Sequence, residues 1–276
     1  MFRTLMAIVI VALSSHAHAV DREATLCGPI KERFFFWQWS LAAPNPNPAR
    51  VAGLAHVEAT TFVTGDGKRL VGYRYAAHGN LNEEGQPRGY VLMAMGNAMV
   101  ADMMIQHLGD FAAAGFDTYV FDYRGYGNSQ GRRRINAIIE DYKEIVAALN
   151  ERYPSARLYG TSLGGAVMMN VIGSGVEFER AVIDASPSRF SPFGCPRRID
   201  PVEHLPEDAR RLLVITGQRD SVLSARMTRE LRIEAEKRGA EVIDGEDYDH
   251  PFMDRAEVHR ERMERIEHFL LAEPSL

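Results

Sequence analysis

The stretch Leu158-Tyr159-Gly160-Thr161-Ser162-Leu163-Gly164-Gly165 decides the fold that we predict for this chain. A short apolar run ends in Gly-x-Ser-x-Gly and continues into an apolar segment of small residues. This pattern is typical of a nucleophile elbow, in which a strand turns sharply into a helix with serine at the apex. A serine in that strained conformation tolerates nothing bulky two residues away, a demand that Gly160 and Gly164 meet. A glycine-punctuated turn without chemistry is the alternative, because short motifs also arise by chance.

Apolar runs of strand length alternate with helical patterns along most of the chain. Strands are expected at 90–95, 118–121, 157–161, 181–185, 212–216 and 241–244, and helices at 100–114, 135–152, 226–238 and 253–271. Ahead of them, residues 57–64 and 70–76 alternate in period two on either side of Gly65-Asp66-Gly67-Lys68, which predicts a hairpin. The fold class is therefore α/β, a mostly parallel sheet with an antiparallel N-terminal hairpin and helices on both faces. Ligands bind such sheets at the carboxyl ends of the strands.

Residues 187–209 link two of these strands through five prolines and little apolar periodicity. The segment is too short and irregular for a separate cap domain. We therefore predict no large cap and an open site.

The composition excludes several classes of protein. At 276 residues, 46% hydrophobic and 25% charged, the chain suits one sizeable folded domain and not a disordered one. The net charge is −5, and the longest basic run is Arg132-Arg133-Arg134, which we interpret as a solvated helix start. Nothing here indicates a nucleic acid as partner.

The first nineteen residues have the pattern of a signal peptide. Arg3 is followed by an apolar run at 5–13, and Ala17-His18-Ala19 fits cleavage after Ala19. The run is too short to span a bilayer, so an exported protein, periplasmic or secreted, is predicted, with an uncleaved membrane anchor as the alternative. Export would expose the two cysteines, Cys27 and Cys195, to oxidising conditions, which favours a disulfide between them over two buried thiols.

Residues 20–55 form a predicted arm ahead of the main domain. Phe34-Phe35-Phe36-Trp37-Gln38-Trp39 is densely aromatic, and Pro44-Asn45-Pro46-Asn47-Pro48 follows it. Packing of these aromatics on the domain is the favoured interpretation. A sticky patch for a membrane surface or an acyl chain is the alternative.

A serine hydroxyl needs a base to take its proton and an acid to orient that base. After an elbow of this kind the acid and then the base are expected at the ends of later strands. Asp220 follows the strand at 212–216 after a glycine turn, and His250 follows the last strand. Asp247 and Asp249 are rival candidates for the acid. A residue that lies so close to His250 in the chain, however, is badly placed to reach the far nitrogen of the His250 ring.

The other histidines fit the role of base less well. His259 and His268 fall within the charged last helix, where solvation or capping is expected. His56, His78, His107 and His204 precede the acid, in the wrong chain order.

An oxyanion formed at the serine would need two N–H donors. The backbone N–H of Leu163 is one expected donor. Asn97, after the strand at 90–95, is the second, with Ala98 as a near alternative. No metal and no cofactor is expected.

Four segments together resemble the α/β-hydrolase superfamily, most closely its capless serine-aminopeptidase-like branch. They are Met95-Gly96-Asn97-Ala98, Phe121-Asp122-Tyr123-Arg124-Gly125-Tyr126-Gly127-Asn128-Ser129, Gly160-Thr161-Ser162-Leu163-Gly164-Gly165 and Gly217-Gln218-Arg219-Asp220. The resemblance covers about 56–271, so 56–276 is the expected α/β-hydrolase domain. Met95 stands where the family usually has histidine, and Asp249-His250-Pro251 replaces a commoner glycine-rich lead.

The resemblance implies a Ser–His–Asp triad that hydrolyses an acyl bond. We expect an exported serine hydrolase acting on carboxylic esters or thioesters of a small or acylated molecule. A serine peptidase and a catalytically silent hydrolase fold used for binding are the alternatives.

Overall fold

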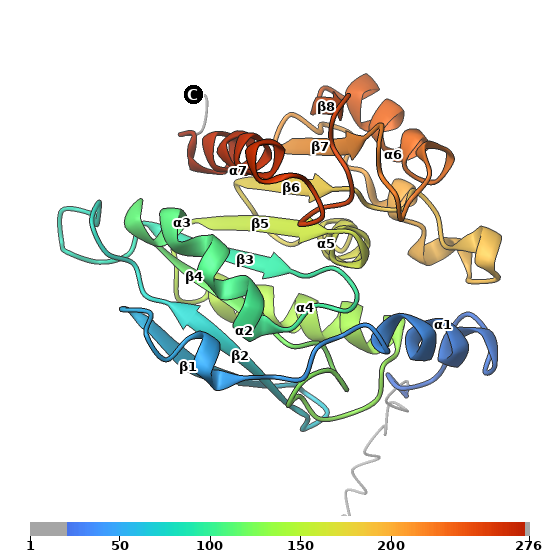
Figure 1. The fold of residues 1–276 in the computed structure, drawn as a ribbon, viewed down its shortest axis with the longest axis horizontal. Helices are drawn as coiled ribbons and strands as arrows, with labels where there is room; N and C mark the ends of the chain where they lie inside the picture. The colour runs from blue at the N-terminus through green and yellow to red at the C-terminus, as the bar shows by residue number, and fades with distance from the viewer. Residues whose placement is uncertain (1–20, 274–276) are drawn as a thin grey trace, which may run out of the picture.

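A computed structural model describes residues 21–273, so the predicted signal peptide lies outside the described residues. Eight strands form one sheet in the order β1-β2-β4-β3-β5-β6-β7-β8. The strands are β1 (Val57–Val63), β2 (Arg69–Tyr75), β3 (Gly89–Ala94), β4 (Phe116–Phe121), β5 (Ala156–Thr161), β6 (Arg180–Asp184), β7 (Leu212–Gly217) and β8 (Glu241–Gly245). The β1–β2 and β2–β4 pairings are antiparallel and the others are parallel, as Figure 1 shows, so the predicted sheet and its N-terminal hairpin are confirmed.

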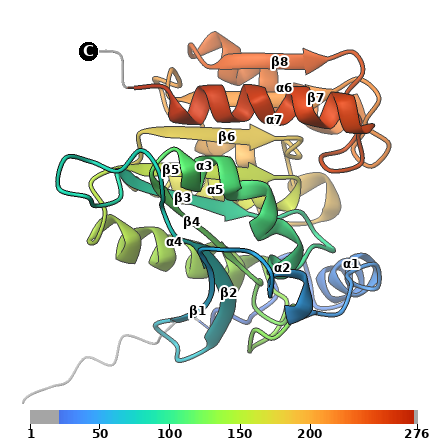
Figure 2. The ribbon, with the colours of Figure 1, turned by 60° about the vertical axis from the view of Figure 1, so that its left-hand side comes forward.

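Helices cover both faces of this sheet (Figure 2). One face carries α2 (Ala101–Met104), α3 (Gly109–Ala113) and α7 (Ala256–Leu271), and the other carries α4 (Ile135–Asn150), α5 (Leu163–Ile172) and α6 (Ala225–Lys237). Every residue of β3, β4, β5 and β7 is buried. Because both faces are covered, these strands are buried along their whole length and do not alternate between buried and exposed residues.

The helix expected at 100–114 is broken into three pieces. Between α2 and α3 the chain forms a 3₁₀ turn, η2 (Ile105–Leu108). In a 3₁₀ turn residues three apart lie on the same side. Ile105 and Leu108 are both fully buried, so the tighter winding points both side chains into the core.

The arm contains a helix, α1 (Lys31–Ser40), which its aromatic and proline-rich sequence does not predict, and η1 (Pro48–Arg50) follows it. In Figure 1 α1 lies at the side of the molecule toward which β3 and β5 point. Cys27, just before α1, forms a disulfide with Cys195. Among the described helices none is both long and apolar enough to cross a membrane.

The arm also changes the environment of the arginine triplet. Arg134 is buried, and its Nε donates to the carbonyl oxygen of Glu23 in the arm. The Arg133 guanidinium stacks over the Tyr126 ring at 5.1 Å. The interpretation of this triplet as a solvated helix start is therefore wrong for these two residues, because the arm and a tyrosine cover them. Arg132 alone stays largely exposed.

Residues 187–209 contain only short 3₁₀ turns, which are η3 (Ser191–Phe193), η4 (Arg197–Ile199) and η5 (Pro201–His204). No helical cap domain is inserted between β6 and β7, both of which are fully described, as the proline content predicted.

Candidate active site

Ser162 lies at the junction of β5 and α5, in the conformation that the motif predicts. Its φ is 53° and its ψ is −119°, a strained region for a residue with a side chain. Its backbone N–H donates to the carbonyl oxygen of Asp184 at 2.8 Å, which holds the apex against the end of β6. The serine is therefore fixed at the carboxyl edge of the sheet.

Two glycines are needed here because backbone segments approach closely. A Cβ on Gly160 would lie 2.6 Å from the carbonyl oxygen of Gly164. A Cβ on Gly164 would lie 1.9 Å from the carbonyl oxygen of Ala94, at the end of β3. Larger residues would push α5 away from the sheet, and Ser162 would move with it.

His250 and Asp220 lie beside each other although thirty residues separate them. The His250 Nδ1 is 2.9 Å from one Asp220 carboxylate oxygen and 3.1 Å from the other, and both side chains are buried. Burial alone would raise the pKa of Asp220. Hydrogen bonds from the His250 ring and from the backbone N–H groups of Leu223 and Val222 outweigh it and lower that pKa. An ionised carboxylate at Nδ1 leaves Nε2 as the nitrogen able to accept a proton.

The rival acids have other partners. One Asp249 carboxylate oxygen accepts three hydrogen bonds, from the Ser221 N–H (2.9 Å), the Ser221 hydroxyl (2.7 Å) and the His250 backbone N–H (2.6 Å). Asp247 pairs with Arg219 at the surface. Asp249 thus links the loop that carries Asp220 to the loop that carries His250.

Sequence reasoning missed Arg262, a buried arginine in α7 that supports the loop of His250. Its Nη1 donates to Asp254 at 2.7 Å and its Nη2 to the carbonyl oxygen of Asp249 at 3.0 Å, and the guanidinium lies 4.4 Å from the Tyr248 ring. Its Nε faces the fully buried Asp184 at 3.8 Å. The signal in the sequence is an arginine on the apolar face of the last helix, four residues before Ile266.

The loop after β3 lies against the serine. A Cβ on Gly96 would be 3.5 Å from the Ser162 Cβ. The Asn97 side-chain oxygen accepts a hydrogen bond from the Tyr126 hydroxyl, and Ala98 has a left-handed φ of 64°. The backbone N–H groups of Leu163 and Asn97, with Ala98 as the alternative, stay the predicted oxyanion donors.

Ser162, Leu163, Asn97 and His250 line one pocket of about 830 Å³. Apolar side chains form most of its wall, among them Met99, Met103, Met104, Phe190, Val222, Leu223, Phe252 and Met253. This pocket, which we call the site pocket, is wide enough for a small organic ligand.

Two further histidines line the site pocket, His107 and His259. The His259 ring lies 5.2 Å from the Phe252 ring and 5.6 Å from the His107 ring, and its Nδ1 is buried without a hydrogen-bond partner. Burial lowers the pKa of both histidines. The expectation that His259 is solvated or capping is therefore wrong, because the loop after β8 folds Phe252 over it.

Within residues 21–273 no group of three or more His, Cys, Asp or Glu side chains is arranged to hold a metal ion. The site brings a serine and a carboxylate-bound imidazole to the wall of one pocket.

Comparisons with known proteins agree with this architecture. A family model described as serine aminopeptidase, S33, matches residues 85–191. A monoacylglycerol lipase of Mycolicibacterium smegmatis is 32% identical over 88 residues, which cover 30% of this chain and 31% of that protein. The uncharacterised protein YfhR of Escherichia coli is 28% identical over 131 residues, 46% of this chain and 45% of that protein. The chain therefore spans less than half the length of these curated relatives.

Solved structures resemble the chain over most of its length. The Pyrococcus furiosus esterase Pf2001 has a TM-score of 0.63 and 18% identity, covering 83% of this chain and 96% of that one. An alpha-beta hydrolase from Vibrio vulnificus has a TM-score of 0.65 and 15% identity, covering 88% and 94%. At these identities the likeness is one of fold.

Proposed function

Because this chain belongs to the α/β-hydrolase superfamily, we propose that it is a serine hydrolase that cleaves carboxylic ester or thioester bonds. The observation that carries the proposal is a strained serine and a carboxylate-bound histidine facing one pocket. A hydrogen bond of 2.9 Å joins His250 to Asp220, and Ser162 and His250 line the same cavity.

The proposed reaction proceeds through an acyl-enzyme. The Ser162 oxygen attacks the acyl carbon while His250 Nε2 takes the hydroxyl proton, and Asp220 stabilises the imidazolium that forms. The N–H groups of Leu163 and Asn97 donate to the oxyanion. The bond to the leaving group then breaks, and His250 passes its proton to the departing alcohol or thiol. A water activated by His250 releases the acid and restores Ser162.

The wall of the site pocket favours esters over peptides with a free N-terminus. An aminopeptidase needs a carboxylate to bind the substrate's ammonium group. Asp254 is the one carboxylate among the residues that line the site pocket. Its side chain is buried and ion-paired with Arg262 at 2.7 Å. A serine peptidase is the second candidate, favoured by the description of the matching family model.

Export and the nature of the partners belong to the same proposal. The pattern of residues 1–19 supports cleavage near Ala19 and a periplasmic or secreted protein, and the Cys27–Cys195 disulfide fits an oxidising compartment. N-terminal sequencing of the chain recovered from the soluble exported fraction and from the membrane fraction tests this, because an intact Met1 on a membrane-bound chain would favour an uncleaved anchor. The proposed partner is a small acylated molecule, not a nucleic acid.

A fluorophosphonate probe, which reacts covalently with activated serines, tests the central claim. We expect labelling of the wild type and of a Ser224→Ala control, since Ser224 is an exposed serine at the start of α6. Labelling should disappear in Ser162→Ala and in His250→Ala, with circular dichroism unchanged. A folded wild type that does not label would replace the proposal by a silent binding module.

A second assay separates the two enzymatic candidates. We compare p-nitrophenyl esters with aminoacyl p-nitroanilides as substrates. Ester turnover that is lost in Ser162→Ala supports the proposal, and turnover of the anilides alone would favour the peptidase.

A further inference from the structure

A second, narrower cavity of about 80 Å³ opens beside the site pocket, between the arm and residues 187–195. The two cavities share Leu163, Pro187, Phe190 and Leu223 as lining residues, so they adjoin directly next to Ser162. The narrow cavity is otherwise lined mainly by apolar side chains, which are Phe35, Phe36, Ile135, Phe193 and Met227. We call it the arm cavity.

The one charged residue that lines the arm cavity offers it no free polar group. Glu32 is 2% exposed, and its carboxylate accepts hydrogen bonds from the backbone N–H groups of Leu26 (2.6 Å), Cys27 (2.9 Å) and Ile135 (3.2 Å). Ile135 is the first residue of α4, where an N–H group has no partner within the helix and a carboxylate is favoured. Glu32 therefore anchors the arm to the domain and leaves an apolar wall.

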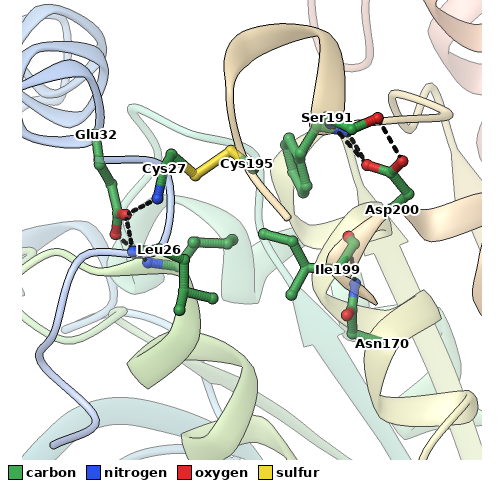
Figure 3. Close-up of a disulfide and its surroundings, with 10 residues drawn as sticks. Leu26, Cys27, Glu32, Asn170, Ser191, Cys195, Ile199 and Asp200 are labelled. Carbon is green, nitrogen blue, oxygen red and sulfur yellow. Dashed lines mark hydrogen bonds between the residues drawn. A yellow bond between two sulfur atoms is a disulfide. The ribbon is translucent and has the colours of Figure 1, made fainter. Parts of the chain in front are cut away.

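The opposite wall is held as firmly (Figure 3). The buried Asp200 accepts from the backbone N–H groups of Phe190 and Ser191, both at 2.7 Å, and from the Ser191 hydroxyl at 2.6 Å. Asn170 in α5 donates to the carbonyl oxygen of Ile199 at 3.2 Å, so the helix that follows Ser162 also supports this segment. The Cys27–Cys195 disulfide joins the two walls. The cavity is thus pre-formed, and a ligand would not have to order its walls.

The position of His250 indicates which part of a substrate enters the arm cavity. The leaving group must depart where the histidine can protonate it, and His250 lines the site pocket. The lining residues of the arm cavity include neither His250 nor Asp220, but they include Leu163, whose N–H is the predicted oxyanion donor. An ester held with its carbonyl oxygen at Leu163 and its leaving group at His250 would turn its acyl chain toward the arm cavity.

We propose that the arm cavity is the binding site for the aliphatic acyl chain of the substrate, with the disulfide-tethered helix α1 as one wall. The proposal rests on the proposed function and deepens it, because it assigns the substrate class as esters or thioesters of aliphatic acids longer than acetate. An apolar chain gains about 0.8 kcal/mol, or about a fourfold preference, for each methylene removed from water.

The test blocks the cavity without touching the triad. Met227 on α6 is half-buried and lines the arm cavity, so Met227→Trp should fill it. Arg229→Trp, two residues further on the exposed side of α6, adds the same ring outside the cavity as the matched control. The double variant Cys27→Ser with Cys195→Ser removes the disulfide, so the arm helix α1 is no longer tethered as one wall of the cavity. We measure kcat/KM for p-nitrophenyl decanoate relative to p-nitrophenyl acetate.

We expect the wild type and Arg229→Trp to prefer decanoate. If the tryptophan of Met227→Trp excludes about three methylenes from the arm cavity, the decanoate-to-acetate ratio should fall about 60-fold. Loss of the disulfide should lower the ratio at least about fourfold. A ratio unchanged in a folded Met227→Trp variant would overturn the proposal, as would a wild type that prefers acetate.

A binding measurement distinguishes failure of this inference from failure of the proposed function. Ser162→Ala, which cannot turn over, is titrated with the fluorescent fatty acid cis-parinaric acid, with and without Met227→Trp. Binding that Met227→Trp weakens at least tenfold supports the acyl site even if the wild type hydrolyses no ester. Equal binding by the two proteins refutes the acyl site even if esters are hydrolysed.

Discussion

Asp249 offers a test of how this fold places its base, because one of its carboxylate oxygens accepts three hydrogen bonds that join two loops. In Asp249→Ala the links to Ser221 and to the His250 backbone are lost together, while the His250 side chain is unchanged. The carboxylate is partly exposed, so we assign about 1 kcal/mol to each bond and about 2–3 kcal/mol to the set. If this interaction energy serves to hold His250 in its catalytic position, losing it raises the activation barrier by the same amount, and kcat/KM should drop about 30- to 150-fold.

The conservative variant separates positioning from charge. Asp249→Asn keeps a side-chain oxygen in the same place, so we expect it to retain most of the activity, within about fivefold of wild type. Both variants are assayed with p-nitrophenyl esters, and their free energies of unfolding are measured in urea. The reasoning is refuted if Asp249→Ala loses stability but keeps its kcat/KM, or if Asn is as damaging as Ala.

Three further predictions concern the support of the site. Gly164→Ala places a methyl group against the carbonyl oxygen of Ala94 and should displace the elbow, lowering kcat/KM on the order of 100-fold, and unchanged kinetics would contradict the close approach. Arg262→Ala leaves Asp184 buried without its cation and should lower the free energy of unfolding in urea by about 3–5 kcal/mol, whereas a loss below about 1 kcal/mol would show that the network is dispensable. Burial raises the pKa of Asp122 to about 6, above its value in the unfolded chain, so the folded state keeps a proton that the unfolded state releases. The contribution of Asp122 to the free energy of unfolding should therefore fall by roughly 3 kcal/mol as pH rises from about 4 to about 6. Over that pH range the Asp122→Asn variant should become more stable relative to the wild type. A difference between the two proteins that is constant with pH would be evidence against this titration.

The residues that local patterns describe well are those whose geometry depends on their neighbours in the chain. The glycines around Ser162 indicated a strand-to-helix turn, and the structure gives that serine its strained φ of 53°. The hairpin at 57–76 followed from its period-two alternation, and the buried strands followed from short apolar runs, because both signals lie within a few neighbouring residues. The helix at 100–114 is where this reasoning fell short, since packing of Ile105 and Leu108 against the sheet favours a tighter winding than propensity predicts.

The contacts between distant segments could not be derived from such patterns. The sequence could name Asp249 as a rival acid, but only the fold shows its carboxylate bound to Ser221 and its carbonyl oxygen to Arg262. The pattern of a charged helix predicts a surface position for His259, whereas in the structure the Phe252 ring packs on the His259 ring. Burial is a property of the whole fold, and a helical pattern with mixed charge does not report it.

The sequence by itself determined the fold class, the elbow at Ser162 and the order in which an acid and a base should follow it. Spacing along the chain is enough for these features, because they depend on backbone conformation and on which residues end the strands. Only the tertiary structure decided that Asp220 contacts His250, that Arg262 lies buried beneath their loops and that helix α1 closes a second cavity beside the serine. His250 and Asp220 are 30 positions apart in the chain, and the disulfide beside the second cavity joins residues 168 positions apart. Which distant groups meet is set by the packing of helices on the sheet.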